Sequence, residues 1–203
     1  MFSGIIDKLA PVNAVRRAGD TLVLNVQTGY VDAVLGESIA VNGVCLTVAK
    51  LAKNGDADFF VSQETLQRTN LGTLGEKFSV NLERSVKLET RLSGHLVQAH
   101  VDGKAVLSFA APEEETHRLV FSLPSDLGRF CVEKGSIALN GISLTINAVR
   151  QMENGDTAVD VTIIPHTWEH TNLHTLKSGD AVNVEIDVIA KYVERLCQPY
   201  LTP

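Results

Sequence analysis

The chain of 203 residues contains an internal repeat, and this feature constrains the fold more than any other. Four blocks of the first half recur in the second half, in the same order and about 100 residues later. They are Asn42–Val48 with Asn140–Ile146, Thr65–Leu71 with Thr167–Leu173, Val80–Glu83 with Val182–Glu185, and, most weakly, Ser3–Ile6 with Gln98–Val101. The repeat predicts two homologous domains, residues 1–91 and 92–187, followed by a tail at 188–203.

Each half has the pattern of antiparallel β structure. Residues Val182–Asp187 alternate apolar and polar side chains, which is typical of a half-buried strand. Asn54-Gly55 and Asn154-Gly155 predict hairpins, and we expect type I′ turns there because Asn-Gly tolerates positive φ. Short strands about every 10 residues favour a small barrel or sandwich in each half. A short helix is predicted after Glu64 and another after Pro165, since proline suits the first helical turn.

The tail carries an amphipathic helical pattern over Val188–Cys197. Ile189, Val193 and Leu196 are spaced to form one apolar stripe. This helix follows the end of the second repeat, so the barrel of its own chain has no position in which to pack it. We therefore expect the apolar stripe to contact a partner chain.

Composition excludes several classes of function. Hydrophobic content of 44% and charged content of 21% are ordinary for a globular protein, and no segment has the length of a membrane helix. The net charge of −6 shows no basic cluster, which argues against a nucleic-acid partner. Three separated cysteines, without a CxxC pair or an export signal, predict a cytoplasmic protein with neither disulfides nor a structural zinc.

The repeated Asn-Gly blocks carry the clearest candidate binding residues. In a strand, Cys45 and Thr47 share one face while Leu46 lies on the other. Ser143 and Thr145 repeat this arrangement in the second half. The pattern has a purely structural interpretation, a turn followed by core strand residues, but matching outward polar pairs also suit recognition of carbonyls or ring nitrogens.

Two groups of histidines invite other interpretations. His166, His170 and Glu169 match an H-x-x-E-H zinc motif, with His174 one turn further on. The equivalent segment Glu64–Arg68 has no histidine, so the repeat argues against metal. At the junction of the halves, His95 and His100 are structural by default, although pockets form at junctions and histidine carries protons near neutral pH.

The chain as a whole resembles the trimeric, α-subunit type of the riboflavin synthase family. The motifs that carry the resemblance are Met1–Ile6, Asn42–Val48, Glu64–Leu66, Gly94–Gly103, Lys134-Gly135, Asn140–Ile146, Ile164–Thr167, Asn183–Asp187 and Tyr192–Leu196. The resemblance implies an all-β fold: two tandem six-stranded antiparallel Greek-key barrels and a C-terminal helix that joins three chains. It also implies a dismutation of two 6,7-dimethyl-8-ribityllumazine molecules into riboflavin and 5-amino-6-ribitylaminouracil, without cofactor or metal.

The resemblance further implies a set of binding residues in each half. The first set is Gly4, Ile5, Ile6, Cys45, Leu46, Thr47, Ser62, Gln63, Glu64, Thr65, Leu66 and Gln67. The second-barrel set is Ala99, His100, Val101, Lys134, Ser143, Leu144, Thr145, Ile164, Pro165, His166, Thr167, Trp168 and Glu169. Ala99 and Trp168 depart from the usual glycine and leucine, so the site is expected to be narrower at Ala99, and Trp168 could stack on or flank the ligand.

Roles for His100, Thr145, Cys45, Ser143 and Asp187 follow as hypotheses. His100 and Thr145 are expected to help deprotonate the C7 methyl group of one lumazine, and Cys45 or Ser143 to activate the other. Asp187 could stabilise a developing cation or the polar edge of the ring. The family working site lies between the first barrel of one chain and the second barrel of a neighbour, and association with lumazine synthase stays open. The rival hypotheses are a non-catalytic lumazine-binding or flavin-binding antenna protein and a β-barrel interaction module.

Overall fold

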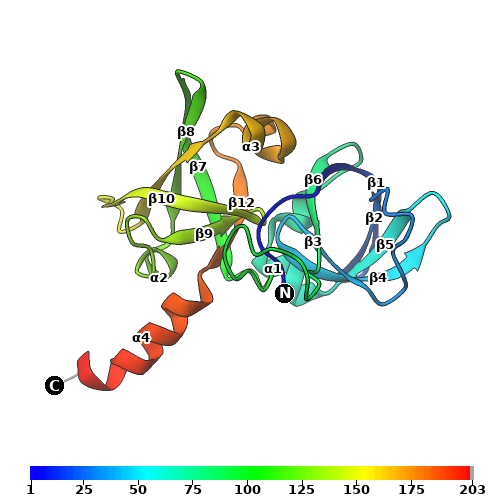
Figure 1. Ribbon diagram of the computed structural model, residues 1–203, viewed down its shortest axis with the longest axis horizontal. Helices are drawn as coiled ribbons and strands as arrows, with labels where there is room; N and C mark the ends of the chain where they lie inside the picture. The colour runs from blue at the N-terminus through cyan, green and yellow to red at the C-terminus, as the bar shows by residue number, and fades with distance from the viewer. Residues whose placement is uncertain (202–203) are drawn as a thin grey trace.

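The computed structural model describes residues 1–201, which form two closed six-stranded antiparallel barrels and a terminal helix (Figure 1). Barrel 1 consists of β1 (Lys8–Ala18), β2 (Thr21–Gln27), β3 (Ser38–Val41), β4 (Val44–Leu51), β5 (Asp56–Val61) and β6 (Ser79–Arg84). Barrel 2 consists of β7 (Gly103–Glu113), β8 (Thr116–Leu123), β9 (Ser136–Leu139), β10 (Ile142–Gln151), β11 (Thr157–Ile163) and β12 (Ala181–Ile186). The helices are α1 (Gln63–Arg68), α2 (Ser125–Gly128), α3 (Pro165–His170) and α4 (Val188–Leu201), with 3₁₀ turns at Asn70–Thr73 and Asn172–Thr175.

The two barrels have the same topology. Strands follow one another around barrel 1 in the order β1-β2-β5-β4-β3-β6, and the corresponding strands of barrel 2 follow the same Greek-key order. Alternate residues of β2, Leu22, Leu24 and Val26, point into the barrel and are fully buried. The two homologous domains expected from the repeat are confirmed, and so are the six-stranded Greek-key barrels that the resemblance implies. The predicted domain boundary after residue 91 falls in the connection between β6 and β7.

The type I′ turns occur at a different Asn-Gly pair from the one predicted. Asn54 does not have positive φ; only Gly55 does, and the Gly55 N–H donates to the Ala52 carbonyl in a three-residue hairpin loop. The two-residue loops with positive φ at both positions are Asn42-Gly43 and Asn140-Gly141. The hairpins predicted at Asn54-Gly55 and Asn154-Gly155 are present, but the expected turn type was wrong, because the pair alone does not fix the length of the loop between the strands.

These two turns meet where the barrels pack together. A Cβ on Gly43 would lie 2.6 Å from the backbone nitrogen of Gly141, so the backbones approach too closely for any side chain. Six buried asparagines surround this contact, three from each repeat: Asn42, Asn70, Asn81, Asn140, Asn172 and Asn183. They bond mostly across the interface, in related pairs: Asn81 Nδ2 donates to the Asn172 Oδ1 at 2.9 Å, and the Asn70 N–H donates to the Asn183 Oδ1 at 2.7 Å. The repeated asparagines therefore fix the two barrels in one relative position.

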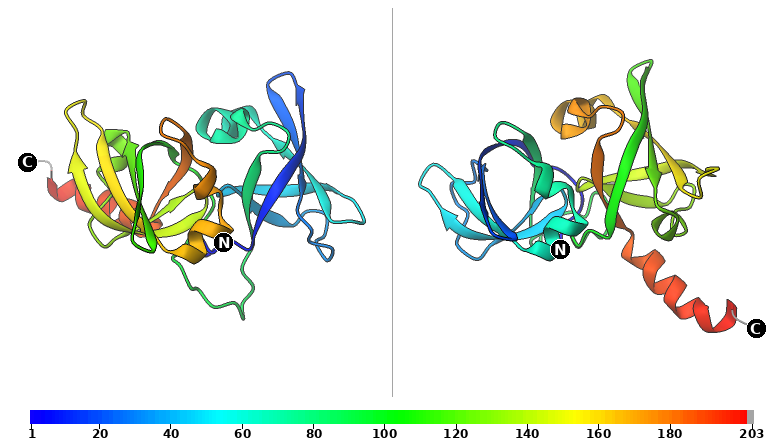
Figure 2. Two further views of the ribbon diagram at one scale, coloured as in Figure 1. Left: turned by 90° about the horizontal axis from the view of Figure 1, so that it is seen from above. Right: turned by 180° about the vertical axis from the view of Figure 1, so that it is seen from behind.

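Helix α4 extends away from barrel 2 and leaves the body of the molecule (Figures 1 and 2). Its apolar side chains are largely exposed: Ile189 by 57%, Val193 by 53% and Leu196 by 70%. The predicted stripe is present and uncovered within the described chain; residues 202 and 203 of the predicted tail lie outside the described residues. No helix among residues 1–201 is both long enough and apolar enough to cross a membrane.

Candidate functional site

The outward polar pairs occupy the positions that strand alternation predicts. In β4, Leu46 and Val48 are buried in the core of barrel 1, while Cys45 is half-buried and Thr47 exposed on the other face. In β10, Leu144 is buried while Ser143 is half-buried and Thr145 exposed. Each barrel therefore presents a small polar pair just after its Asn-Gly turn.

The segment that covers each polar pair comes from the other repeat. The Ser143 N–H of barrel 2 donates to the Gly4 carbonyl at 2.8 Å, and the Cys45 N–H of barrel 1 donates to the Ala99 carbonyl at 2.9 Å. The apolar neighbours follow the same exchange, since Ile6 packs on the core of barrel 2 and Val101 on the core of barrel 1.

The predicted grouping of these segments is therefore wrong. Gly4, Ile5 and Ile6 belong with the Ser143 site, whereas Ala99, His100 and Val101 belong with the Cys45 site. The physical reason is that the barrels pack together at their Asn-Gly turns. This packing places the N–H of Cys45 in β4 beside residues 98–101, and the N–H of Ser143 in β10 beside residues 3–6. Within one chain, His100 consequently lies at the site of barrel 1, whereas Thr145 lies at the site of barrel 2.

A buried glutamate anchors each crossing segment. Glu83 at the end of β6 accepts hydrogen bonds from the Ser3 N–H at 2.6 Å, the Ser3 hydroxyl at 2.8 Å and the Gly4 N–H at 2.9 Å. Glu185 in β12 accepts from the Gln98 N–H at 2.7 Å and the His100 N–H at 3.1 Å. Burial raises the pKa of both carboxyl groups, although the backbone N–H donors act in the opposite direction. Sequence reasoning missed this role, yet both glutamates lie in a repeated block.

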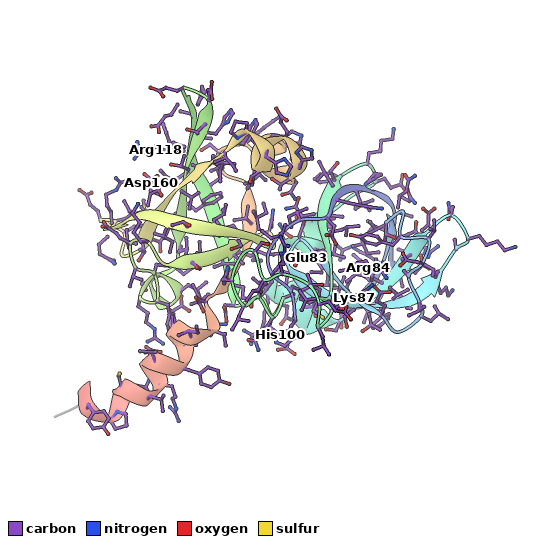
Figure 3. All side chains as sticks on the ribbon, in the orientation of Figure 1. Glu83, Arg84, Lys87, His100, Arg118 and Asp160 are labelled. Atoms are coloured by element: carbon purple, nitrogen blue, oxygen red, sulfur yellow. The ribbon has the colours of Figure 1, made fainter. Side chains whose placement is uncertain are left out.

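A large open cavity lies beside the polar pair of barrel 1. It has a volume of about 1150 Å³, and Cys45, Gln98 and His100 line it together with Glu83 and Arg84. Figure 3 labels three residues that line this cavity, Glu83, Arg84 and His100. The side chain of His100 is exposed and the Cys45 thiol is only partly covered, so both are accessible to a ligand.

The polar pair of barrel 2 has a different environment. His95, from the connection between the barrels, places its Nδ1 2.7 Å from the Ser143 Oγ. The backbone is tightly packed at this point, because a Cβ on Gly94 would lie 2.8 Å from the Ser143 Cβ. A separate cavity of about 470 Å³ lies beside α3, where Ile6 faces His166 and Glu169.

Both predicted short helices are present; α1 begins at Gln63, one residue before Glu64, and α3 begins at Pro165. Ser62 caps α1 by accepting from the Thr65 N–H, and Leu66 packs on the core of barrel 1. Pro165 opens α3, and Trp168 packs on the core of barrel 2 with its ring stacked on His117, 3.8 Å between centroids. Trp168 is thus held by a protein partner on one face of its ring.

Two further candidates, Lys134 of the second-barrel set and the catalytic candidate Asp187, have backbone partners of their own. Lys134 is exposed in the turn before β9, with φ of 64° and its N–H bonded to the Ile146 carbonyl. Asp187 accepts from the Ile189 N–H at 2.9 Å and so caps α4. Its charge also acts on His95, which places it electrostatically near the Ser143 site.

His170 of the H-x-x-E-H motif and the following His174 bond to the backbone through their rings. His170 Nδ1 lies 2.8 Å from the His166 carbonyl oxygen, and His174 Nδ1 lies 2.7 Å from that of Thr171. The rings of His166 and His170 are stacked. Among residues 1–201 no group of three potential metal ligands comes together.

Comparison with known proteins identifies the family. The lumazine binding domain model matches the chain twice, at residues 3–85 and 98–187. The riboflavin synthase of Mycobacterium tuberculosis strain H37Rv is 42% identical over 97% of this chain and 98% of its own length. The chain belongs to the riboflavin synthase family. It is accordingly an enzyme of the transferase class with two lumazine-binding domains.

Other members of the riboflavin synthase family and more distant structures agree with this assignment. The enzyme of Bacillus subtilis strain 168 is 38% identical over 96% of this chain and 89% of its own length. Among solved structures, LumP complexed with riboflavin superposes with a TM-score of 0.82 over 92% of this chain and 99% of LumP, at 23% identity. LumP complexed with 6,7-dimethyl-8-(1'-D-ribityl) lumazine gives a TM-score of 0.79. At such low identity these structures support the two-barrel fold alone.

Proposed function

We propose that the chain converts two molecules of 6,7-dimethyl-8-ribityllumazine into riboflavin and 5-amino-6-ribitylaminouracil by transfer of a four-carbon unit. The observation that carries the proposal is the pair of polar sites at equivalent positions of two homologous barrels, which suits a reaction whose two substrates are the same molecule. The two products together contain every atom of the two lumazines, so the reaction requires neither an oxidant nor a cofactor.

We further propose that the working site forms between two chains. Helix α4 presents an uncovered apolar face, and the cavity beside Cys45 and His100 is open. A homotrimer held by α4 would place barrel 1 of one chain against barrel 2 of the next. His100 and Thr145, which lie in different barrels of one chain, would then come from neighbouring chains and act on the same pair of ligands.

The reaction requires a base of moderate strength and a precise orientation of the two lumazine rings. The C7 methyl group of the lumazine is acidic because its carbanion delocalises into the ring. His100 is accessible in the Cys45 cavity and can accept this proton, which is expected to accelerate the step by about 10²–10⁴-fold. Holding two rings face to face contributes more, on the order of 7–11 kcal/mol. The free cysteines agree with action in the cytoplasm, where thiols stay reduced.

Incubation of the purified chain with the lumazine tests the activity, with one riboflavin expected for every two lumazines consumed. Binding without riboflavin formation would favour the antenna-protein alternative. Failure to bind at all would favour the interaction module.

Mixing two inactive variants tests the site between chains. His100→Gln disables barrel 1 and Thr145→Val disables barrel 2. If each site joins two chains, mixed trimers contain an intact site and activity returns; if each site lies within one chain, mixing restores nothing. Each variant remixed with itself is the control.

A further inference from the structure

The side chain of His95, in the connection between the barrels, reaches the polar pair of barrel 2. Its Nδ1 lies 2.7 Å from the Ser143 Oγ, and its own N–H donates to the Ser3 carbonyl at 3.2 Å. The backbone around it is fixed further by Phe2 and Val97, which bond to each other through both N–H groups. The imidazole is therefore held in place by the crossing N-terminal segment.

The other ring nitrogen of His95 has an unusual position. Nε2 is buried and has no hydrogen-bond partner among residues 1–201. Burial also lowers the pKa of His95, against the opposing charge of Asp187. A half-buried neutral imidazole whose only side-chain partner is one hydroxyl group is costly for stability, which suggests that the contact serves the site.

Barrel 1 lacks this arrangement. Cys45 occupies the position of Ser143, but its sulfur has no hydrogen-bond partner among the described residues. The contact therefore distinguishes two otherwise equivalent sites.

We infer that His95 is a positioning residue that holds the Ser143 hydroxyl in the orientation that contacts the lumazine bound in barrel 2. This inference rests on the proposed function. Because Nδ1 of the imidazole is bonded to the Oγ, it fixes the rotamer of Ser143. It also determines whether the hydroxyl presents its proton or a lone pair to the ligand. Barrel 2 then presents a fixed polar group where barrel 1 presents a free thiol.

The test is a double-mutant cycle with matched replacements. Asparagine places its amide where Nδ1 lies, whereas glutamine places it where Nε2 lies and fills a similar volume. His95→Gln is expected to lower kcat about 10- to 100-fold with a much smaller change in KM, and His95→Asn to retain most of the activity. In a Ser143→Ala background, His95→Gln is expected to cost less than about twofold further, because the two residues act as a unit.

A purely structural role predicts a different result. His95→Gln would then cost the same factor with and without the Ser143 hydroxyl, or His95→Asn would be as slow as His95→Gln, and either result overturns the inference. His174→Asn, an exposed histidine of the same barrel, is the control and should leave the rate unchanged.

Failure of the proposed function would be recognised separately. If the unaltered chain makes no riboflavin, the same variants can be titrated with the lumazine while the fluorescence of Trp168, the sole tryptophan, is followed. Coupling between His95 and Ser143 in the dissociation constant supports the positioning role in that case, and its absence overturns it.

Discussion

The two barrels share one topology and one set of turns, yet their polar sites differ at three points. Barrel 1 has Cys45 with an exposed His100 beside it, and barrel 2 has Ser143 with His95 bonded to its hydroxyl. Where barrel 1 has His100, the equivalent segment that crosses to barrel 2 has Ile5. Two identical substrates must play different parts in a dismutation, and the duplicated scaffold supplies that difference through residues that lie on the crossing segments.

The largest effect is expected at His100, because the equivalent position at the barrel 2 site holds Ile5, which cannot accept a proton. His100→Gln should lower the rate of riboflavin formation by about 10²–10⁴-fold while the lumazine still binds, because the proton of the C7 methyl group loses its acceptor. Steady-state rates with binding measured in parallel test this. A near-native rate would mean that orientation of the two lumazines alone accounts for catalysis. His100 would then not be the residue that gives the two binding sites different roles.

The contact between the Asn-Gly turns should be the most sensitive point for stability. Gly141→Ala would bring a Cβ to 2.7 Å from the Gly43 nitrogen at a φ of 80°, so the unfolding free energy should fall by about 3–4 kcal/mol. Gly155→Ala is the matched control: it has positive φ too, but open space around it, and should cost about 1–2 kcal/mol. Urea denaturation of both variants measures the difference. Equal losses would show that the barrels do not depend on this close approach.

Much of this architecture could be predicted from the sequence because the repeat shows which residues are equivalent. The outward positions of Cys45 and Ser143 followed from strand alternation alone. The exchange of crossing segments could not be predicted, because two homologous barrels offer the same edge to Gly4 and to Ala99, and equivalence does not say which edge each segment takes.

Other residues carried a signal that pattern reasoning did not interpret. Asn81 and Glu83 recur in the second repeat as Asn183 and Glu185, polar residues in otherwise buried strands. Such repetition indicates a shared interface or anchor, and the structure shows both. His95 lies outside the four repeated blocks and gave no such signal; only its position beside Ser143 distinguishes it.

Replacing the two anchoring glutamates should affect different binding sites. Glu83→Gln places an amide against the N–H groups of Ser3 and Gly4, so it should cost about 1–3 kcal/mol of unfolding free energy and weaken the Ser143 site. Glu185 accepts two hydrogen bonds where Glu83 accepts three, so Glu185→Gln should cost less, and its effect should fall on the His100 site.

Lumazine titrations followed by Trp168 fluorescence separate the two cases, because this tryptophan reports on barrel 2. The signal should change in Glu83→Gln and stay near native in Glu185→Gln. The reverse result would contradict the exchange of segments between the barrels.

The smallest effect is expected in the pH dependence of stability, and it should come from barrel 2. Burial lowers the pKa of His95 in the folded chain below the unfolded value of about 6.5. The unfolded chain therefore binds more protons in this window, and the contribution of His95 to stability is present above about pH 6.5 and is lost as the pH falls through the folded pKa. His95→Asn, which cannot titrate, should flatten this slope in urea unfolding followed by Trp168 fluorescence. An unchanged slope would show that His95 is solvated in the folded state, and the asymmetry between the two sites would then reduce to Cys45 against Ser143 and His100 against Ile5.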